Sequence, residues 1–291
     1  MSSVAKQLAT FVAVLAVLFT GGAVAGQLIE PEARGGDKVS GHGAGRAHGD
    51  SVRSAGTHGG EPAKQVGGLA VADQGLRLAV EQPELRRGRA ETVAFRIVDE
   101  NGEVVRDFDV EHERPMHLIV ARRDLTGFQH LHPQMDAAGA WTTELELPAA
   151  GSYRLFADFS RDGEAFTLAT DLRVDGAADL TPLPAPRATA VSDGGYDVRL
   201  DSAGAKGGEE AELRFAITRD GRPVDTEPYL GAGGHLVALR EGDLAFLHVH
   251  PDDERVGFRA TFPSAGRYRL FLQFKHEGRV RTVAFTQEVS R

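Results

Sequence analysis

A histidine-bearing segment that occurs twice constrains this chain more than any other feature. The first copy, MHLIVARRDLTGFQHLHPQM, spans residues 116–135, and a related sequence, HLVALREGDLAFLHVHP, follows further along the chain. Three histidines recur at a constant offset of 118 residues, as His117, His130 and His132 in the first copy and His235, His248 and His250 in the second. A constant offset over several positions indicates an internal duplication, so we expect the same folding unit twice.

Length and composition narrow the possible classes of protein. The 291 residues suffice for two domains of about 100 to 150 residues each. A formal net charge of −9 offers no basic surface, so no nucleic-acid partner is expected. The chain has no cysteine, which excludes disulfides, thiolate metal sites, iron–sulfur clusters and a type 1 copper centre.

The N-terminal segment predicts export. After residues 1–7, which we place in the cytoplasm, residues 8–28 carry no charge and are long enough for a transmembrane helix. Lys6 favours a cytoplasmic N-terminus. The same segment also fits a cleaved signal peptide that ends near Ala25. We expect a single-pass plasma-membrane protein with its folded part on the extracytoplasmic side, or a secreted protein if the segment is cleaved.

Residues 29–68 are rich in glycine, alanine and charge and show no apolar period. This composition predicts a flexible, disordered linker. The linker carries His42, His48 and His58, which either bind metal loosely or are incidental to a solvated spacer.

Short alternating runs separated by turns predict β-strands from residue 69 onward. In residues 69–176, Val93, Phe95 and Ile97 share one strand face, and further strands are expected at 141–147, 153–159 and 166–174. Tyr153 follows a Pro-to-Ser loop, like the corner tyrosine of immunoglobulin-like domains. This unit is predicted to be a β-sandwich.

The same pattern returns after residues 177–187, a proline-rich connector that should be stiff and extended. In residues 188–291, Leu213, Phe215 and Ile217 repeat the alternating face, and Tyr268 repeats the corner. The predicted class is therefore all-β, with two tandem immunoglobulin-like β-sandwich domains after an N-terminal transmembrane helix and a flexible linker.

A β-hairpin would bring the first three histidines together. If it is centred between Asp124 and Leu125, His117 faces His132, and His130 is a diagonal neighbour on the same face. Opposed Cβ atoms are about 5 Å apart and diagonal ones about 7 to 8 Å. Imidazoles at these positions can reach one ion at about 2 Å, so the first copy predicts a metal site.

The second copy predicts an equivalent hairpin, centred at Gly242-Asp243, with unchanged geometry for His235, His248 and His250. The methionines Met116 and Met135 flank the first set of histidines, and Gly234 and Asp253 replace them in the second. Thioether sulfur suits Cu(I), whereas imidazole suits Cu(II), zinc and nickel. We therefore expect the first metal site to be softer than the second.

The histidines also have a simpler interpretation, as packed and hydrogen-bonded side chains. Phe128 and Phe246 share their face, which is therefore expected to be partly core. A single His-x-His is a weak metal signal, but a third cross-strand histidine that is duplicated with it favours metal. Glu111, His112 and Glu113 have no clear second copy and are interpreted as a solvated loop.

At these residues the chain resembles bacterial extracytoplasmic proteins of the YtkA-like and CopC-like group. Their immunoglobulin-like domains often carry M-H-L, then D-L-x-x-F-x-H-x-H-P, then P-x-x-G-x-Y-x-L-F, and the first copy matches at Met116-His117-Leu118, Asp124-Leu125, Phe128, His130, His132-Pro133, Gly151, Tyr153 and Leu155-Phe156. The resemblance covers both folded units. It implies copper or heavy-metal handling in the cell envelope, with ligands at the histidines of both copies.

The resulting hypothesis is a membrane-anchored extracytoplasmic protein with one three-histidine site per domain. Copper is the expected ion, with zinc or another divalent metal as the alternative, and an envelope metal-transport protein is a candidate partner. A role in metal binding, transfer or tolerance is expected rather than catalysis, because no shared general base and no G-x-S-x-G motif is found. The alternatives are a structural or interaction module of the envelope and, less favoured, a zinc enzyme with an open coordination position.

Overall fold

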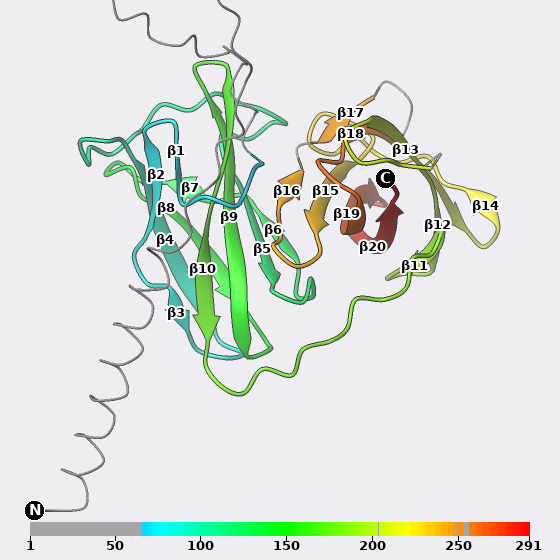
Figure 1. The fold of residues 1–291 in the computed structure, drawn as a ribbon, viewed down its shortest axis with the longest axis horizontal. Helices are drawn as coiled ribbons and strands as arrows, with labels where there is room; N and C mark the ends of the chain where they lie inside the picture. Colours follow the sequence, from blue (N-terminus) through cyan, green and yellow to red (C-terminus); the bar gives the residue numbers. More distant parts are fainter. Residues whose placement is uncertain (1–65, 203, 248, 253–255) are drawn as a thin grey trace, which may run out of the picture. The chain divides into compact units, whose positions relative to one another are not determined.

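The computed structural model describes residues 66–202, 204–247, 249–252 and 256–291 (Figure 1). All regular structure in these ranges is β-strand, which confirms the predicted all-β class. No helix that could span a membrane occurs in the described ranges. The expected anchor at 8–28 lies outside them, as do residues 29–65 of the expected linker with His42, His48 and His58.

Two sheets form the first half of the described chain. Their strand orders are β1-β2-β4-β8-β7 and β3-β10-β9-β5-β6, and all pairs are antiparallel except β3 with β10. The strands are Ala72–Asp73 (β1), Leu76–Val80 (β2), Glu84–Leu85 (β3), Ala90–Val98 (β4), His117–Arg122 (β5), Gln129–Leu131 (β6), Gln134–Met135 (β7), Trp141–Glu146 (β8), Gly151–Arg161 (β9) and Glu164–Val174 (β10).

Two further sheets form the second half. One has the order β11-β12-β13-β18-β17 with β14 also paired to β13, and the other has the order β16-β15-β19-β20. The strands are Thr189–Ser192 (β11), Tyr196–Asp201 (β12), Glu210–Arg219 (β13), Arg222–Pro223 (β14), His235–Arg240 (β15), Phe246–Leu247 (β16), Val249–Pro251 (β17), Gly257–Thr261 (β18), Gly266–His276 (β19) and Arg279–Val289 (β20).

Each half is a β-sandwich with its own apolar core. The alternating residues of β4, Val93, Phe95 and Ile97, are buried and pack in one cluster with residues of the opposite sheet, and the alternating face of β13 does the same in the second half. The predicted tyrosine corners are confirmed. The hydroxyl of Tyr153 donates to the carbonyl of Ala149 at 2.9 Å, and the Tyr268 hydroxyl donates to the Ser264 carbonyl at 2.9 Å.

A third apolar cluster joins the two sandwiches. Strand β5 is buried along its whole length, because one face fills the core and the other packs against the second sandwich. Five pairs of its members are equivalent in the two repeats: Ile119 with Val237, Ala121 with Leu239, Phe128 with Phe246, Phe156 with Phe271 and Ala169 with Ala284. The sixth pair, Leu125 and Leu244, are the positive-φ leucines of the two hairpin turns, one position apart in the repeat. The two repeats thus meet through the same face, as subunits of an isologous dimer do.

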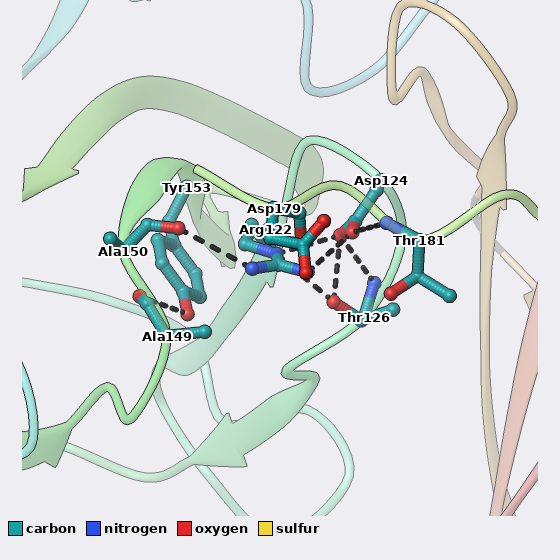
Figure 2. Close-up of polar contacts among 8 residues, drawn as sticks. All are labelled: Arg122, Asp124, Thr126, Ala149, Ala150, Tyr153, Asp179 and Thr181. Atoms are coloured by element: carbon teal, nitrogen blue, oxygen red, sulfur yellow. Dashed lines mark hydrogen bonds and ion pairs between the residues drawn. The ribbon is translucent and has the colours of Figure 1, made fainter. Parts of the chain in front are cut away.

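The proline-rich connector is fixed to the first sandwich by a buried ion pair (Figure 2). Arg122 Nη2 lies 2.5 Å from Asp124 Oδ2 and donates to the Asp179 carbonyl at 3.2 Å. The backbone N–H of Thr181 donates to Asp124 Oδ2 at 2.8 Å. Burial alone would raise the pKa of Asp124, but hydrogen bonds from Arg122, Thr126 and Thr181 outweigh it and hold that pKa well below its ordinary value.

Candidate functional site

Both predicted hairpins form with the predicted register. In the first, Ile119 of β5 lies opposite His130 of β6, which centres the hairpin between Asp124 and Leu125. In the second, Leu239 of β15 lies opposite Phe246 of β16. The register of the paired residues was therefore placed correctly from the sequence in both hairpins.

The second hairpin then departs from the first, and the prediction of unchanged geometry was wrong. After Leu247 the chain leaves the sheet of β15, and β17 pairs instead with β18 of the opposite sheet. This places His250 opposite Arg259, with its side chain exposed. His248 lies outside the described residues.

A histidine triad forms across the two repeats instead. One ring nitrogen from each of His117, His130 and His235 lies within 4.8 Å of the other two. His117 and His235 are equivalent positions of the duplication, and their rings stack with centroids 5.6 Å apart and planes 8° apart. The face that carries the histidines is the face through which the sandwiches pack, so the two copies share one cluster.

Two more histidines border this triad. The centroid of the His132 ring is 5.1 Å from that of His117 and 4.8 Å from that of His130. The half-buried ring of His112 lies 6.1 Å from His117 and 5.8 Å from His235, measured between ring centroids.

Sequence reasoning missed His112, which is part of the cluster and not a solvated loop. His112 and Glu113 both have positive φ, in a tight turn closed by a bridge between Glu111 and Arg114. The second repeat has the same turn, bridged between Tyr229 and Ala232, with a leucine at the position of His112. The turn is duplicated in conformation but not in sequence, so comparing the two copies by residue type could not reveal it.

Burial keeps the clustered rings neutral. Burial, together with repulsion from the His117 ring, lowers the pKa of His130 to about 3 and that of His132 to about 4. The pKa of His117 is also lowered by burial, and that of His235 lies well below its ordinary value for the same reason. Neutral imidazoles keep a lone pair, which is the form that binds metal ions.

The outer nitrogens of two triad members face oxygen acceptors. His117 Nε2 lies 3.2 Å from the Glu111 carbonyl oxygen, and His130 Nδ1 lies 2.7 Å from Gln273 Oε1. A carbonyl can only accept, so both outer nitrogens carry the proton. The inner nitrogens, His117 Nδ1 and His130 Nε2, lie 3.0 Å apart. In neutral rings both are then lone pairs that point at a common space.

The residues behind the triad are also related by the duplication. Asp158 pairs with His117 in the β5–β9 ladder, and Gln273 pairs with His235 in the β15–β19 ladder. Thr167 donates to Asp158 at 2.6 Å, and Gln273 donates to Thr282 at 3.2 Å. Asp158 is the carboxylate at the position that Gln273 occupies in the second repeat. Burial raises the pKa of Asp158, which favours its protonated, uncharged form.

The two methionines predicted as soft ligands do not belong to the nitrogen triad. Met116 is fully buried in the core of the first sandwich, and Met135 packs, partly buried, against the same core. A Cβ atom on Gly234, the residue at the position of Met116, would lie 2.9 Å from the Gln273 carbonyl oxygen. The second repeat therefore has no room for a methionine there. Asp253 lies outside the described residues.

Both folded repeats match one family. The domain of unknown function DUF8832 matches residues 70–176 and again residues 189–291. The chain belongs to the DUF8832 family. The double match confirms the duplication in this DUF8832 protein, while the resemblance to YtkA-like and CopC-like proteins stays a prediction.

No curated protein matches this DUF8832 chain. Among solved structures, the Escherichia coli adhesin FdeC is similar with 14% identity over 76% of this chain and 66% of the adhesin, at a TM-score of 0.27. Salmonella alpha-2-macroglobulin shows 13% identity over 77% of this chain, at a TM-score of 0.28, and Yersinia pseudotuberculosis InvD shows 12% over 74%, at 0.25. The chain spans 15% of that alpha-2-macroglobulin and 57% of InvD. TM-scores this low transfer no function.

Proposed function

We propose that this protein binds one transition-metal ion between its two sandwiches, through His117, His130 and His235. The observation that carries the proposal is the pair of inner nitrogens 3.0 Å apart, whose rings both use their outer nitrogens as donors. Two lone pairs at this distance repel unless a cation lies between them. An imidazole ligand that donates its outer N–H to a carbonyl is the usual arrangement around a bound metal ion.

The spacing of the two inner nitrogens of His117 and His130 fits such an ion. With metal–nitrogen bonds of about 2.0 to 2.1 Å, ligands at right angles lie about 2.9 Å apart and tetrahedral ones about 3.4 Å apart. The 3.0 Å pair falls in that range, and the third nitrogen, within 4.8 Å of the other two, would move closer to them when all three bind one ion. Imidazole donors without thiolate suit Cu(II), zinc or nickel. Copper is the ion we propose, with zinc as its competitor.

The proposed role is metal binding and transfer rather than catalysis. One shared ion replaces the two separate ions that the sequence alone predicted. The uncharged segment 8–28 supports placing the folded part outside the cytoplasm, tethered to the plasma membrane, where an envelope metal-transport protein would be the exchange partner.

Isothermal titration of the metal-free full-length protein in detergent tests this proposal. The wild type should bind Cu(II) or Zn(II), and His130→Ala should lose that binding. His250→Ala is the matched control, because its side chain is exposed on a strand of the opposite sheet. If His250→Ala loses binding as fully as His130→Ala, the shared triad is not the site.

The apolar interface favours a second candidate, a structural or interaction module that needs no metal. Twelve residues of the two repeats and Leu183 of the connector pack the two sandwiches together. In this case the histidines are a buried hydrogen-bonded network, with the amide of Gln273 turned so that its nitrogen donates to His130. The melting temperature would then be the same with and without added metal.

A further inference from the structure

An open pocket of about 340 Å³ lies on the first sandwich beside His132. Its walls include Phe108 and Trp141, whose rings meet edge to face with centroids 5.3 Å apart. Pockets that hold small organic ligands are typically about 300 to 1,000 Å³ and lined mainly by apolar and aromatic groups. This pocket therefore has the size and the lining of a small-molecule site.

Two of the residues that line this pocket each have a buried ring nitrogen without a partner. Trp141 Nε1 and His132 Nε2 make no hydrogen bond among the described residues, and the Trp141 side chain is only 2% exposed. The indole N–H can only donate. Buried polar groups nearly always have a hydrogen-bond partner, so these nitrogens leave unused hydrogen-bonding capacity in residues that line the pocket.

The charged groups of the pocket are all cationic. Arg106 and Arg114 line it and are exposed, and no aspartate or glutamate lines it. Neither arginine has an ion-pair partner within the described part of the chain, and Arg106 makes one long hydrogen bond, of 3.4 Å, to the Ala138 carbonyl. Guanidinium groups with free donors favour carboxylates, which they can bind through two parallel hydrogen bonds.

We propose that this pocket binds a small organic acid with an aromatic or apolar body. The body would lie against Phe108 and Trp141, and the carboxylate would face Arg106 and Arg114. This pocket borders the histidine cluster at His132, but the proposal does not depend on bound metal.

The second repeat offers an internal comparison. Trp141 pairs with Phe95 in β4, and the corresponding backbone contact in the second repeat joins Phe215 to Val256. The pocket at this place is larger, about 490 Å³, but it is lined by Val256 and Asp225 and by no arginine, histidine or tryptophan. We therefore expect one organic acid per chain, bound to the first repeat alone.

Tryptophan fluorescence tests the proposal, because Trp141 is the single tryptophan of the chain. Phenylacetate is titrated into the metal-free full-length protein, with the uncharged analogue phenylacetamide and with inorganic phosphate in parallel. We expect a saturable change with phenylacetate and at least tenfold weaker binding of phenylacetamide and phosphate. Linear, non-saturating quenching, or equal binding of acid and amide, would overturn the proposal.

Charge-removing variants complete the test. Arg106→Gln and Arg114→Gln should each weaken phenylacetate binding about tenfold or more, since each removes a charged donor to the carboxylate. Both side chains are exposed, so folding should be retained, which an unchanged melting temperature would show. Arg173→Gln, an exposed arginine of the same sandwich away from the pocket, is the control. Unchanged affinity in the Arg106/Arg114 double variant would contradict the assignment.

Discussion

His117 and His235 occupy equivalent positions in the two repeats, and their rings stack 5.6 Å apart across the junction of the sandwiches. Each comes from the first residue of an equivalent strand, β5 or β15, whose apolar face forms that junction. The duplication therefore does more than provide a second copy of a domain. It supplies the third histidine of a triad that neither sandwich forms alone.

If the cluster binds metal, a ligand from the second repeat is as important as those from the first. His235→Ala should lower the affinity for Cu(II) or Zn(II) by more than the roughly 10- to 100-fold that follows loss of a ligand's hydrogen-bond partner. Competition with a chromophoric chelator measures this directly. Full affinity in His235→Ala would mean that the first repeat binds the ion without the second.

Gln273 should set the strength of metal binding through His130. Its Oε1 atom accepts from His130 Nδ1 at 2.7 Å. Gln273→Met removes the acceptor and should lower metal affinity about 10- to 100-fold, whereas Gln273→Glu keeps an acceptor and should preserve or raise the affinity. Equal affinities in both variants would show that this hydrogen bond does not orient a ligand.

The metal-free protein should lose stability in mild acid. Burial holds the pKa of His130 at about 3 in the folded protein, against about 6.5 in the unfolded chain. The unfolded state therefore binds more protons, so stability is full above pH 6.5 and falls as the pH drops toward the folded value. At pH 5 this histidine alone should cost about 2 kcal/mol.

Urea unfolding in the presence of a chelator, at pH 7.5 and pH 5.0, measures this loss. His130→Gln should show a smaller difference between the two pH values than the wild type, because glutamine does not titrate. An equal pH dependence in both proteins would show that His130 is not the buried titrating group.

The junction between the sandwiches should contribute strongly to stability. Phe128 and Phe271 stack across it with ring centroids 4.0 Å apart. Phe271→Ala should lower the free energy of unfolding by about 3 to 5 kcal/mol and divide the calorimetric transition into two, one for each sandwich. Val191→Ala, at a side chain that is 67% exposed, is the control and should change little. A single, unshifted transition in Phe271→Ala would refute a cooperative junction.

The ion pair that fixes the connector should be worth more than a surface pair. The side chains of Arg122 and Asp124 are 7% and 5% exposed. Asp124→Asn leaves the buried guanidinium without its counter-charge and should destabilise the protein by about 3 to 5 kcal/mol. Glu84→Gln, which breaks an ion pair with the well-exposed Arg173, should cost less than about 1 kcal/mol. Thermal unfolding compares the two, and similar losses would contradict this ranking.

Local patterns in the sequence were sufficient for the sandwiches and hairpins. Alternation at Val93, Phe95 and Ile97 reports burial of one strand face, and the centring of the first hairpin follows from the repeat and the turn at Asp124-Leu125. The corner tyrosines were found because their hydrogen bond closes within four residues. Each of these features depends on contacts close along the chain.

The shared cluster depends on contacts between the repeats, which local patterns do not encode. One signal was present in the sequence. Strands β5 and β15 are apolar on both faces, and Ile119 and Val237 lie on the face directed away from the core of their own sandwich. A strand that is apolar on both faces needs a packing partner on each of them. The change of sheet between Leu247 and Val249 had no signal in the histidine spacing. The first repeat makes the same change of sheet between Leu131 and Gln134, so the second repeat makes it a few residues earlier in the aligned sequence.

The number of metal ions bound per chain tests the central claim most directly. Native mass spectrometry of the full-length protein, after loading with Cu(II) or Zn(II) and removal of excess ion, counts them. A shared triad at the junction predicts one tightly held ion per chain, lost in the His117→Ala variant. Two ions per chain, or none, would contradict it.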